Sequence, residues 1–367
     1  MRFKERFYAL YLIFPYLTTY PQIKNRFSFI KSLLFNKFCI IKFKNGIQYS
    51  IEVSDYNTIL RLLSIERYSQ SFQIDGKYVK ISFDNINKFK ITTSKLSKED
   101  KILLNLLDLG LKDGAIFIDE NHDAKIKYEK NVKIIQNKQC LIETSEGIKF
   151  FLDSIGPTPF VETFVKRIHN QYSNDLMGKV VIDVGAANGD TPLYFASKGA
   201  SVYAFEMTKS NFDEMIKNLE LNPVLAKTIT PIHAAIGKDG NIKYHQDSLE
   251  RVSTHGGASF LINKYGAKSI SHNVQGMSLK TILKKFKISQ VDLLKLDCKG
   301  CEFFLKKDEL DSVKRIKIEY YSQMKSQNID SILNMLKELN FNSIIFKHTT
   351  QDTSPLKIHG NILAEKK

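Results

Sequence analysis

Apolar residues, glycines and an acid follow one another in an ordered pattern between Lys179 and Glu206. The pattern opens with three β-branched residues, 180–182, which are typical of a strand buried on both faces. After a glycine turn, residues 191–197 have the pattern of a helix, with proline in the first turn, where a missing N–H costs nothing. A second apolar run, 202–205, ends in Glu206. The order predicts strand, glycine turn, helix, strand and acid.

A second group of buried strands is predicted towards the end of the chain. Residues 291–296 are mostly apolar, which indicates another strand buried on both faces, and Lys295 and Asp297 mark its C-terminal end. Three further strands are expected, at 315–320, 341–346 and 358–364. The last two would form an antiparallel hairpin at the edge of an otherwise parallel sheet, which is unlike a dinucleotide-binding fold.

The first 150 residues have a different pattern. Between about residues 38 and 93, short runs rich in β-branched and aromatic residues indicate strands, and Asn45-Gly46 is a strong hairpin signal. A helix is predicted over 97–109, with Ser97 as its cap and Gly110 as its end. This pattern indicates a separate α+β region.

Two further segments are predicted to be helical. Residues 7–20 are uncharged and strongly apolar, but the run is shorter than the ~18–20 residues that span a bilayer. We interpret it as a helix packed on the protein, with a helix lying on a membrane surface as the alternative. Residues 157–172 have apolar residues at helical spacing, and His169 within them is expected to face solvent.

The glycine turn and the acid together indicate a nucleoside-bearing ligand. Gly185 and Gly189 allow the backbone to approach a ligand closely, and Glu206, about 20 residues on, is placed to accept hydrogen bonds from ribose hydroxyls. The glycine spacing is neither that of a dinucleotide fold nor that of a phosphate loop, which favours S-adenosylmethionine over NAD or ATP. A tight strand-to-helix turn without a ligand is the alternative.

The four cysteines do not form the framework of a disulfide-rich protein, because they are few and scattered. A reducing compartment is the simpler assumption. Cys298 and Cys301 form a C-x-x-C pair, which is at most half of a zinc site, and no metal is expected. A redox role for the pair is an alternative, since it follows a predicted strand.

Positive charge is concentrated at the start of the chain. The formal net charge of the 367 residues is +15. Residues 1–50 contain nine lysines and arginines but one acid, Glu5. Such a region can attract nucleic acid, anionic lipid or an acidic substrate, or it can be an ordinary solvated surface.

From about residue 140 to 365 the chain resembles the FkbM-family methyltransferases. The resemblance rests on VIDVGAANGDTPLYFA, VYAFE, VQGMSLKTILKKFKISQVDLLKLD, and DCKGCE followed by KIEYY. It implies an α/β, Rossmann-like class I methyltransferase domain at 151–367 with a mostly parallel seven-stranded sheet, preceded by a smaller α+β accessory region at 1–150. Two departures from the family pattern are the position of Asn188 and the presence of Lys299 where an acid is common.

The resemblance implies that S-adenosylmethionine is the cofactor and that a hydroxyl is methylated on a sugar, glycan, lipid-linked or polyketide-like acceptor. The expected cofactor-binding residues are Asp183, Gly185, Ala186, Gly189, Asp190, Glu206 and Ala235. For catalysis, Asp297 is the first candidate base, with Glu302 and Glu319 behind it, and Lys295 would hold Asp297 ionised or steady the acceptor. The alternative for this cluster is a salt-bridged set at a strand end.

A small-molecule or glycan acceptor is therefore expected as the partner, with no nucleic acid. We expect a cytoplasmic protein whose basic N-terminus makes peripheral contact with the inner membrane surface. The alternatives are a nucleic-acid methyltransferase, suggested by the positive charge, and a non-catalytic glycan- or membrane-associated module that retains the fold.

Overall fold

The structure is a computed structural model, and it divides into two compact units, Met1–Lys166 and Arg167–Lys367. The predicted border between residues 150 and 151 lies within the first of these units and stays a prediction. The residues that the structure describes are 3–19, 23–68, 71–75, 78–82, 89–92, 96–112, 116–118, 123–126, 130–136, 140–173, 175–247, 269–298, 300–322, 329–350 and 358–367.

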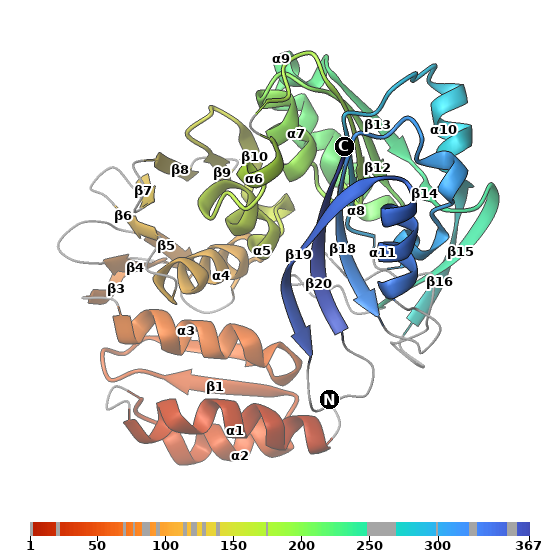
Figure 1. The fold of residues 1–367 in the computed structure, drawn as a ribbon. Helices are drawn as coiled ribbons and strands as arrows, with labels where there is room; N and C mark the ends of the chain where they lie inside the picture. Colours follow the sequence, from red (N-terminus) through yellow and green to blue (C-terminus); the bar gives the residue numbers. More distant parts are fainter. Residues whose placement is uncertain are drawn as a thin grey trace. The chain divides into compact units, whose positions relative to one another are not determined.

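Seven strands form the central sheet of the second unit (Figure 1). In order across the sheet they are β13 (Ile229–His233), β12 (Ser201–Glu206), β11 (Val180–Val184), β17 (Leu293–Leu296), β18 (Arg315–Ser322), β20 (Ile358–Lys366) and β19 (Phe341–Thr350). Neighbours from β13 to β18 are parallel, whereas β20 is antiparallel to both β18 and β19. The predicted sheet, mostly parallel with a final antiparallel hairpin, is confirmed.

The strand order reverses beside β11. The chain moves outward from β11 to β12 and β13 and then returns to place β17 on the other side of β11. At such a reversal the loops leave in opposite directions, so a crevice opens at the carboxyl ends of the strands, where ligands bind in open α/β sheets. The predicted glycine turn and Asp297 follow β11 and β17 at this edge.

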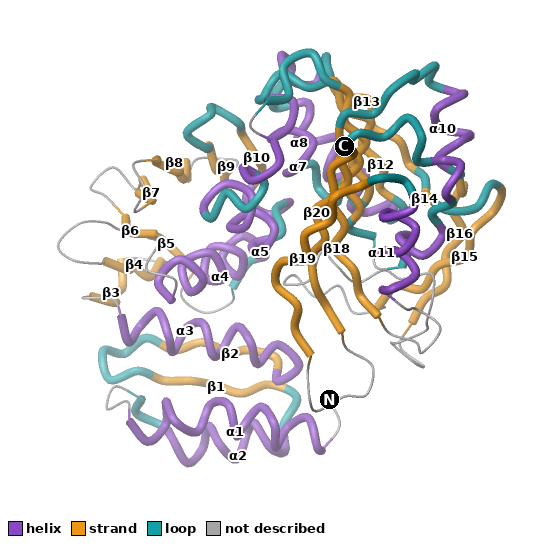
Figure 2. Tube along the Cα trace, viewed as in Figure 1, coloured by secondary structure: helices purple, strands orange, loops and turns teal. Residues whose placement is uncertain are grey.

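Helices lie on both sides of the sheet (Figure 2). Those of the second unit are α6 (Asn170–Ser173), α7 (Asp190–Ser197), α8 (Lys209–Glu220), α9 (Pro223–Ala226), α10 (Leu279–Lys285), the 3-10 turns Cys301–Phe304 and Lys307–Glu309, and α11 (Ile329–Glu338). The central strands are buried because both of their faces are covered: every residue of β17 is buried, including Lys295. Apolar side chains of β11, β17 and β18 form the main core with those of α10 and α11.

A small sheet accompanies the central one. It contains β14 (Ala235–Ile236), β16 (Ser269–Met277) and β15 (Gly240–Asp247), in that order. Ala235 is buried in a minor core with Tyr244 and Val274. The predicted cofactor residue Ala235 therefore belongs to a strand of this small sheet.

The first unit is an α+β assembly of short elements. Its helices are α1 (Phe3–Thr19), α2 (Arg26–Phe35), the 3-10 turn Val53–Asp55, α3 (Tyr56–Tyr68), α4 (Lys98–Lys112), the 3-10 turn Leu152–Ser154, α5 (Pro157–Phe160) and the π-helical turn Val161–Val165. Its strands form three antiparallel sheets: β1 (Phe38–Lys42) with β2 (Gln48–Glu52); β3 (Ser71–Asp75), β4 (Tyr78–Ser82) and β5 (Phe89–Thr92); and β6 (Ile116–Ile118), β7 (Asp123–Ile126), β8 (Lys130–Gln136), β9 (Cys140–Glu143) and β10 (Lys149–Phe151).

Two predictions for this unit, a hairpin and a helix cap, are confirmed. The hairpin at Asn45-Gly46 joins β1 to β2, and Gly46 has a φ of 90° that favours glycine. The cap of α4 is also present, because Ser97 Oγ accepts a hydrogen bond from Asp100 N at 3.1 Å while Asp100 Oδ2 accepts one from Ser97 N at 2.8 Å. Gly110 does not end this helix, since α4 continues to Lys112.

The predicted helix over 157–172 is wrong as a single element. Helical structure ends at Val165, and Arg167 then adopts a φ of 52°, a left-handed conformation that a continuous helix does not allow. The chain resumes as the short helix α6. The residues after the break do not continue the helical face that the sequence pattern predicts. The side chain of His169 is therefore buried, with 4% of its surface exposed, rather than facing solvent.

Within the part of the chain that the structure describes, no helix combines the length and the apolar character that crossing a bilayer requires.

Candidate active site

Three neighbouring strands bring charged residues into one row across the sheet. Asp183 of β11 is in register with Lys295 of β17, and Lys295 is in register with Lys317 of β18. In a parallel sheet, residues in register on adjacent strands lie side by side. All three side chains are at most 2% exposed, so the row must be balanced by ion pairs and hydrogen bonds.

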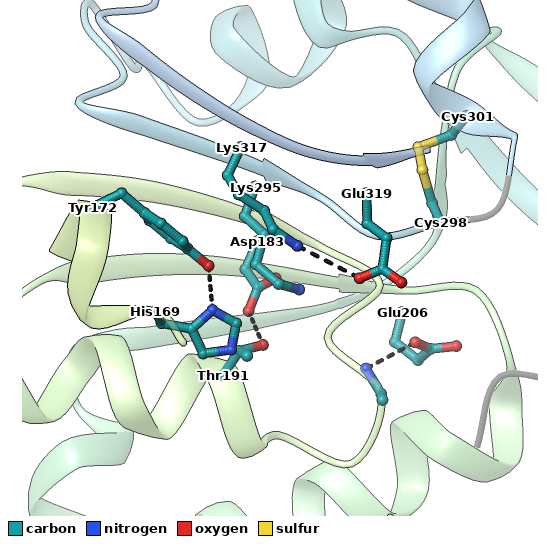
Figure 3. Close-up of polar contacts among 11 residues, drawn as sticks. His169, Tyr172, Asp183, Thr191, Glu206, Lys295, Cys298, Cys301, Lys317 and Glu319 are labelled. Carbon is teal, nitrogen blue, oxygen red and sulfur yellow. Dashed lines mark hydrogen bonds and ion pairs between the residues drawn. A yellow bond between two sulfur atoms is a disulfide. The ribbon is translucent and has the colours of Figure 1, made fainter. Parts of the chain in front are cut away.

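Asp183 and Lys295 form a buried ion pair (Figure 3). Lys295 Nζ donates a hydrogen bond to Asp183 Oδ1 at 2.8 Å, and Thr191 Oγ1 donates to Asp183 Oδ2 at 2.5 Å. Burial lowers the pKa of Lys295, but the charges of Asp183 and Asp297 outweigh it and raise that pKa above its usual value. Lys295 therefore stays charged and is not a proton acceptor.

The glycine turn after β11 is packed against the turn after β17. Gly185 has a φ of 78°, and a Cβ atom at this position would overlap the carbonyl oxygen of Asp297. The N–H groups of Gly185 and Ala186 both donate to the Phe205 carbonyl, at 2.9 and 3.0 Å. The close approach that requires glycine at 185 is thus to the protein's own backbone.

Gly189 is required for a related reason. Its φ is 91°, and a Cβ atom there would lie 3.1 Å from Met215 Cγ. Asp190 then begins α7 and is buried, which places a carboxylate at the positive end of the helix. Ala186 is buried as well.

Glu206 ends β12 and connects two loops. Its Oε2 accepts a hydrogen bond from Ala187 N at 2.9 Å, and its Oε1 accepts one from Thr208 N at 2.8 Å. Burial raises the pKa of the Glu206 carboxyl, and these backbone hydrogen bonds partly oppose the rise. A carboxylate has about four acceptor positions, so the arrangement leaves capacity for hydroxyl donors.

The two acids after β17 have different surroundings. Asp297 is half-buried, and its N–H donates to the Val184 carbonyl at 3.0 Å, which holds it beside the end of β11. Glu302 is fully buried, and its Oε2 accepts a hydrogen bond from Gly300 N at 2.8 Å. Glu302 thus stabilises its own turn, whereas Asp297 lies at the edge where the strand order reverses. Lys299 lies outside the described residues.

Cys298 and Cys301 form a disulfide within this same turn. With Glu302 they make a group of three donors whose ligand atoms lie within 4.8 Å of one another, the one such group found among the described residues. Sulfur binds metals as a thiolate, so the disulfide must be reduced before these residues can hold an ion.

Sequence reasoning missed three residues of this region, His169, Tyr172 and Lys317, whereas it had named Glu319 as a candidate base. The His169 ring nitrogen Nδ1 and the Tyr172 hydroxyl are hydrogen-bonded and buried (Figure 3). Lys317 Nζ pairs with Glu319 Oε2 at 3.5 Å. In both LLKLD and IKIEY a lysine stands two residues before an acid, and this shared spacing is a signal for Lys317. No local pattern predicts the burial of His169.

His169 and Tyr172 are both uncharged. Burial lowers the pKa of His169 well below its ordinary value, and the charges of Lys295 and Lys317 lower it further, with Glu319 opposing them. Burial also raises the pKa of Tyr172, and the Asp183 charge adds to the rise. The Tyr172 O–H is therefore the donor to a neutral imidazole.

Residues 183–343 match the family model described as the methyltransferase FkbM domain. The chain contains an FkbM methyltransferase domain. The matched residues begin at Asp183, one partner of the buried ion pair. They include the glycine turn after β11, the turn after β17, and the side chains Glu206 and Asp297. The chain is a methyltransferase, and S-adenosylmethionine is its cofactor.

Several solved structures are similar to part of this chain. A precorrin-6y C5,15-methyltransferase from Geobacter metallireducens is 11% identical with a TM-score of 0.32, over 55% of this chain and 88% of its own. An rRNA methylase from Streptococcus thermophilus is 13% identical with a TM-score of 0.34, over 55% and 94%. A Streptococcus mutans protein in complex with SAH is 13% identical with a TM-score of 0.33, over 55% and 97%. A comparison with curated protein sequences found no match.

The FkbM domain should depend strongly on the ion pair of its two central strands. In Lys295→Met, the Asp183 carboxylate stays buried without its cation, so we expect the free energy of unfolding to fall by about 3–5 kcal/mol. Urea denaturation measures the change. Lys314→Met is the matched control, because Lys314 pairs with Asp292 at the surface and is 51% exposed, and its loss should cost about 1 kcal/mol or less. Equal effects of the two substitutions would refute the assignment.

The buried imidazole should make the stability of the domain sensitive to acid. Below pH ~6.5 the unfolded chain binds a proton at His169 that the folded chain does not bind, so the free energy of unfolding falls as the pH decreases. As long as His169 stays neutral in the folded chain, the loss approaches about 1.4 kcal/mol for each further pH unit.

His169→Asn keeps an acceptor near the Tyr172 hydroxyl and removes the titration. Urea denaturation at several pH values should show a shallower pH dependence in this variant than in the parent chain. Identical pH dependences would show that His169 binds its proton over the same pH range in the folded and the unfolded chain, which contradicts a lowered pKa.

Proposed function

We propose that the FkbM domain transfers the methyl group of S-adenosylmethionine to a hydroxyl group of a sugar, glycan, lipid-linked or polyketide-like acceptor. The observation that supports this proposal is the position of Asp297. Its carboxylate is half-buried directly after β17, beside the end of β11, at the point where the strand order reverses. A hydroxyl is a weak nucleophile, and a carboxylate in that position is suited to accept its proton.

The cofactor side of the site consists of the glycine turn and Glu206. The carboxylate of Glu206 is fixed from two sides by Ala187 and Thr208, so ribose hydroxyls would meet acceptors that are already oriented. Gly185, Ala186 and Gly189 shape the turn next to the methionine part, with Asp190 at the start of α7. Asp183 acts indirectly, because its side chain is fully buried and is held by Thr191 and Lys295 within the sheet.

S-adenosylmethionine supplies, when bound, a methyl group on a cationic sulfur. Asp297 would take the hydroxyl proton as the acceptor oxygen receives that methyl group, and the electron pair of the broken C–S bond would remain on the sulfur of the departing S-adenosylhomocysteine. The Asp297 charge raises the pKa of Lys295, so the two side chains interact, and the Lys295 cation would hold Asp297 ionised or steady the acceptor. Most of the acceleration would come from holding the two reactants in line.

Glu206→Ala should abolish tight cofactor binding. It removes the acceptor for the ribose hydroxyls, and each charge-assisted hydrogen bond of this kind contributes about 1.5–3 kcal/mol, so the dissociation constant should rise at least roughly tenfold. Calorimetry with S-adenosylmethionine and S-adenosylhomocysteine measures it.

Glu220→Ala, at the exposed end of α8, is the matched control and should bind like the parent chain. Thermal melts of both variants establish that they are folded. Unchanged affinity in a folded Glu206→Ala protein would remove Glu206 from the cofactor site.

Asp297→Asn should separate chemistry from binding. The amide cannot accept the proton, so turnover should fall by roughly 10²–10⁴-fold, while calorimetry shows the cofactor still bound. Turnover is followed as S-adenosylhomocysteine released in the presence of glycan and lipid-linked hydroxyl acceptors.

Asp311→Asn, at an exposed position in the same unit, controls for the loss of one negative charge. Near-parental turnover in Asp297→Asn would exclude Asp297 as the base and would make Glu319, on the neighbouring strand β18, the next candidate.

A further inference from the structure

The first unit exposes a group of large apolar side chains. Of the ten large apolar side chains that are exposed among the described residues, eight lie between residues 7 and 40: Phe7, Tyr8, Tyr11, Phe14, Phe27, Phe35, Phe38 and Ile40. The other two, Met177 and Val224, are isolated. Single exposed apolar residues are normal, whereas a concentration of them indicates a surface that binds a partner.

Helix α1 is apolar on both of its faces. Ala9, Ile13 and Leu17 face inward at helical spacing and are buried. On the outer face Tyr11 is 73% and Phe14 is 52% exposed. From Phe7 to the end of α1 there is no charged residue. A helix that is apolar all round is normally covered on all sides, so the outer face of α1 needs a partner.

Helix α2 packs beside α1 and has a similar outer face. Phe27 (91% exposed), Lys31 and Phe35 (67% exposed) follow one another at intervals of four residues. Arg6 Nη1 of α1 donates to the carbonyls of Leu33 and Asn36 at the end of α2, at 2.9 and 2.7 Å. The two aromatic stripes thus belong to one fixed pair of helices.

Strand β1 adds an aromatic residue beside a cation. Phe38 and Ile40 are on its exposed side, while Cys39 and Ile41 are buried. The Lys37 ammonium lies 5.5 Å from the centre of the Phe38 ring. Asn25 ties β1 to the start of α2, because its side chain donates to the Ile40 carbonyl and accepts from Lys42 N, both at 2.8 Å.

We infer that the exposed aromatic side chains of α1, α2 and β1, here called the aromatic face, dock on the surface of a lipid bilayer that contains anionic lipids. Phenylalanine and tyrosine side chains insert at the boundary between headgroups and acyl chains. The surrounding charge has the sign that an anionic surface attracts, since the first 50 residues contain nine lysines and arginines and one acid. With no described helix able to cross the bilayer, the face would lie on the membrane.

Nucleic acid fits this face less well than lipid. A nucleic-acid surface needs cations interleaved with the aromatic residues along a backbone path. The outer face of α1 is uncharged from Phe7 onward and carries four exposed aromatic residues. A layer of this kind suits an apolar medium bounded by charged headgroups.

The test is flotation of the full chain with phosphatidylcholine vesicles, with and without phosphatidylglycerol. We expect flotation with the anionic vesicles and its loss in two folded variants, Tyr11→Ser with Phe14→Ser and Phe27→Ser with Phe35→Ser. Met177→Ser with Val224→Ser is the matched control, since both of these residues are 77% exposed in the other unit, and it should float like the parent chain.

The contribution of charge is tested separately. Lys31→Gln with Lys37→Gln should weaken partitioning into anionic vesicles by roughly 10- to 30-fold. Lys227→Gln with Lys284→Gln, at exposed positions of the second unit, should change it little. Circular dichroism melts show whether each variant is folded.

Three results would overturn the inference. The first is no flotation of the parent chain, and the second is flotation that survives the aromatic substitutions. The third is occupation of the face by something else: a dimer in sedimentation analysis that the aromatic substitutions dissociate, or RNA binding that they abolish, in either case without vesicle binding.

Docking would present the methyltransferase unit with acceptors carried by lipids, which narrows the acceptor to a lipid-linked hydroxyl. This last step rests on the proposed function. The two ideas fail separately, because flotation does not require the cofactor and calorimetry with S-adenosylmethionine does not require vesicles.

Discussion

The ion pair between Asp183 and Lys295 joins the two central strands of the sheet at the place where the strand order reverses. Both side chains are almost fully buried, so each charge needs the other as its counter-ion. The pair also sets the state of its neighbours. Burial lowers the pKa of His169 and raises that of Tyr172, and the pair adds to both shifts: its cation, with that of Lys317, lowers the pKa of His169 further, and its anion raises the pKa of Tyr172 further. The charges of the FkbM domain's ligand-binding edge are therefore ordered by one contact between adjacent strands.

The sequence was most informative where structure is determined locally. The β-branched run before Asp183, the glycines that follow and the acid at the end of the next strand predicted β11, the turn, α7 and β12 because each signal lies within a few residues of the element that it describes. The antiparallel hairpin of β19 and β20 followed from strand count and position.

Contacts between distant strands were less accessible. The neighbours of Lys295 depend on the register of β17 with β11 and β18, which no local pattern specifies. The burial of His169 depends on a left-handed residue at Arg167, where the sequence has no glycine to mark the break. In α1 both faces are apolar, so the pattern could not say which side faces inward.

The close approach of Gly185 to Asp297 has a consequence for how this protein can diversify. The turn that we propose borders the cofactor and the turn that carries the candidate base share one contact surface with no room for a methyl group, so a change in one displaces the other. Substitutions that alter acceptor preference without disturbing the base are therefore expected in segments outside this contact, such as the small sheet of β14, β16 and β15.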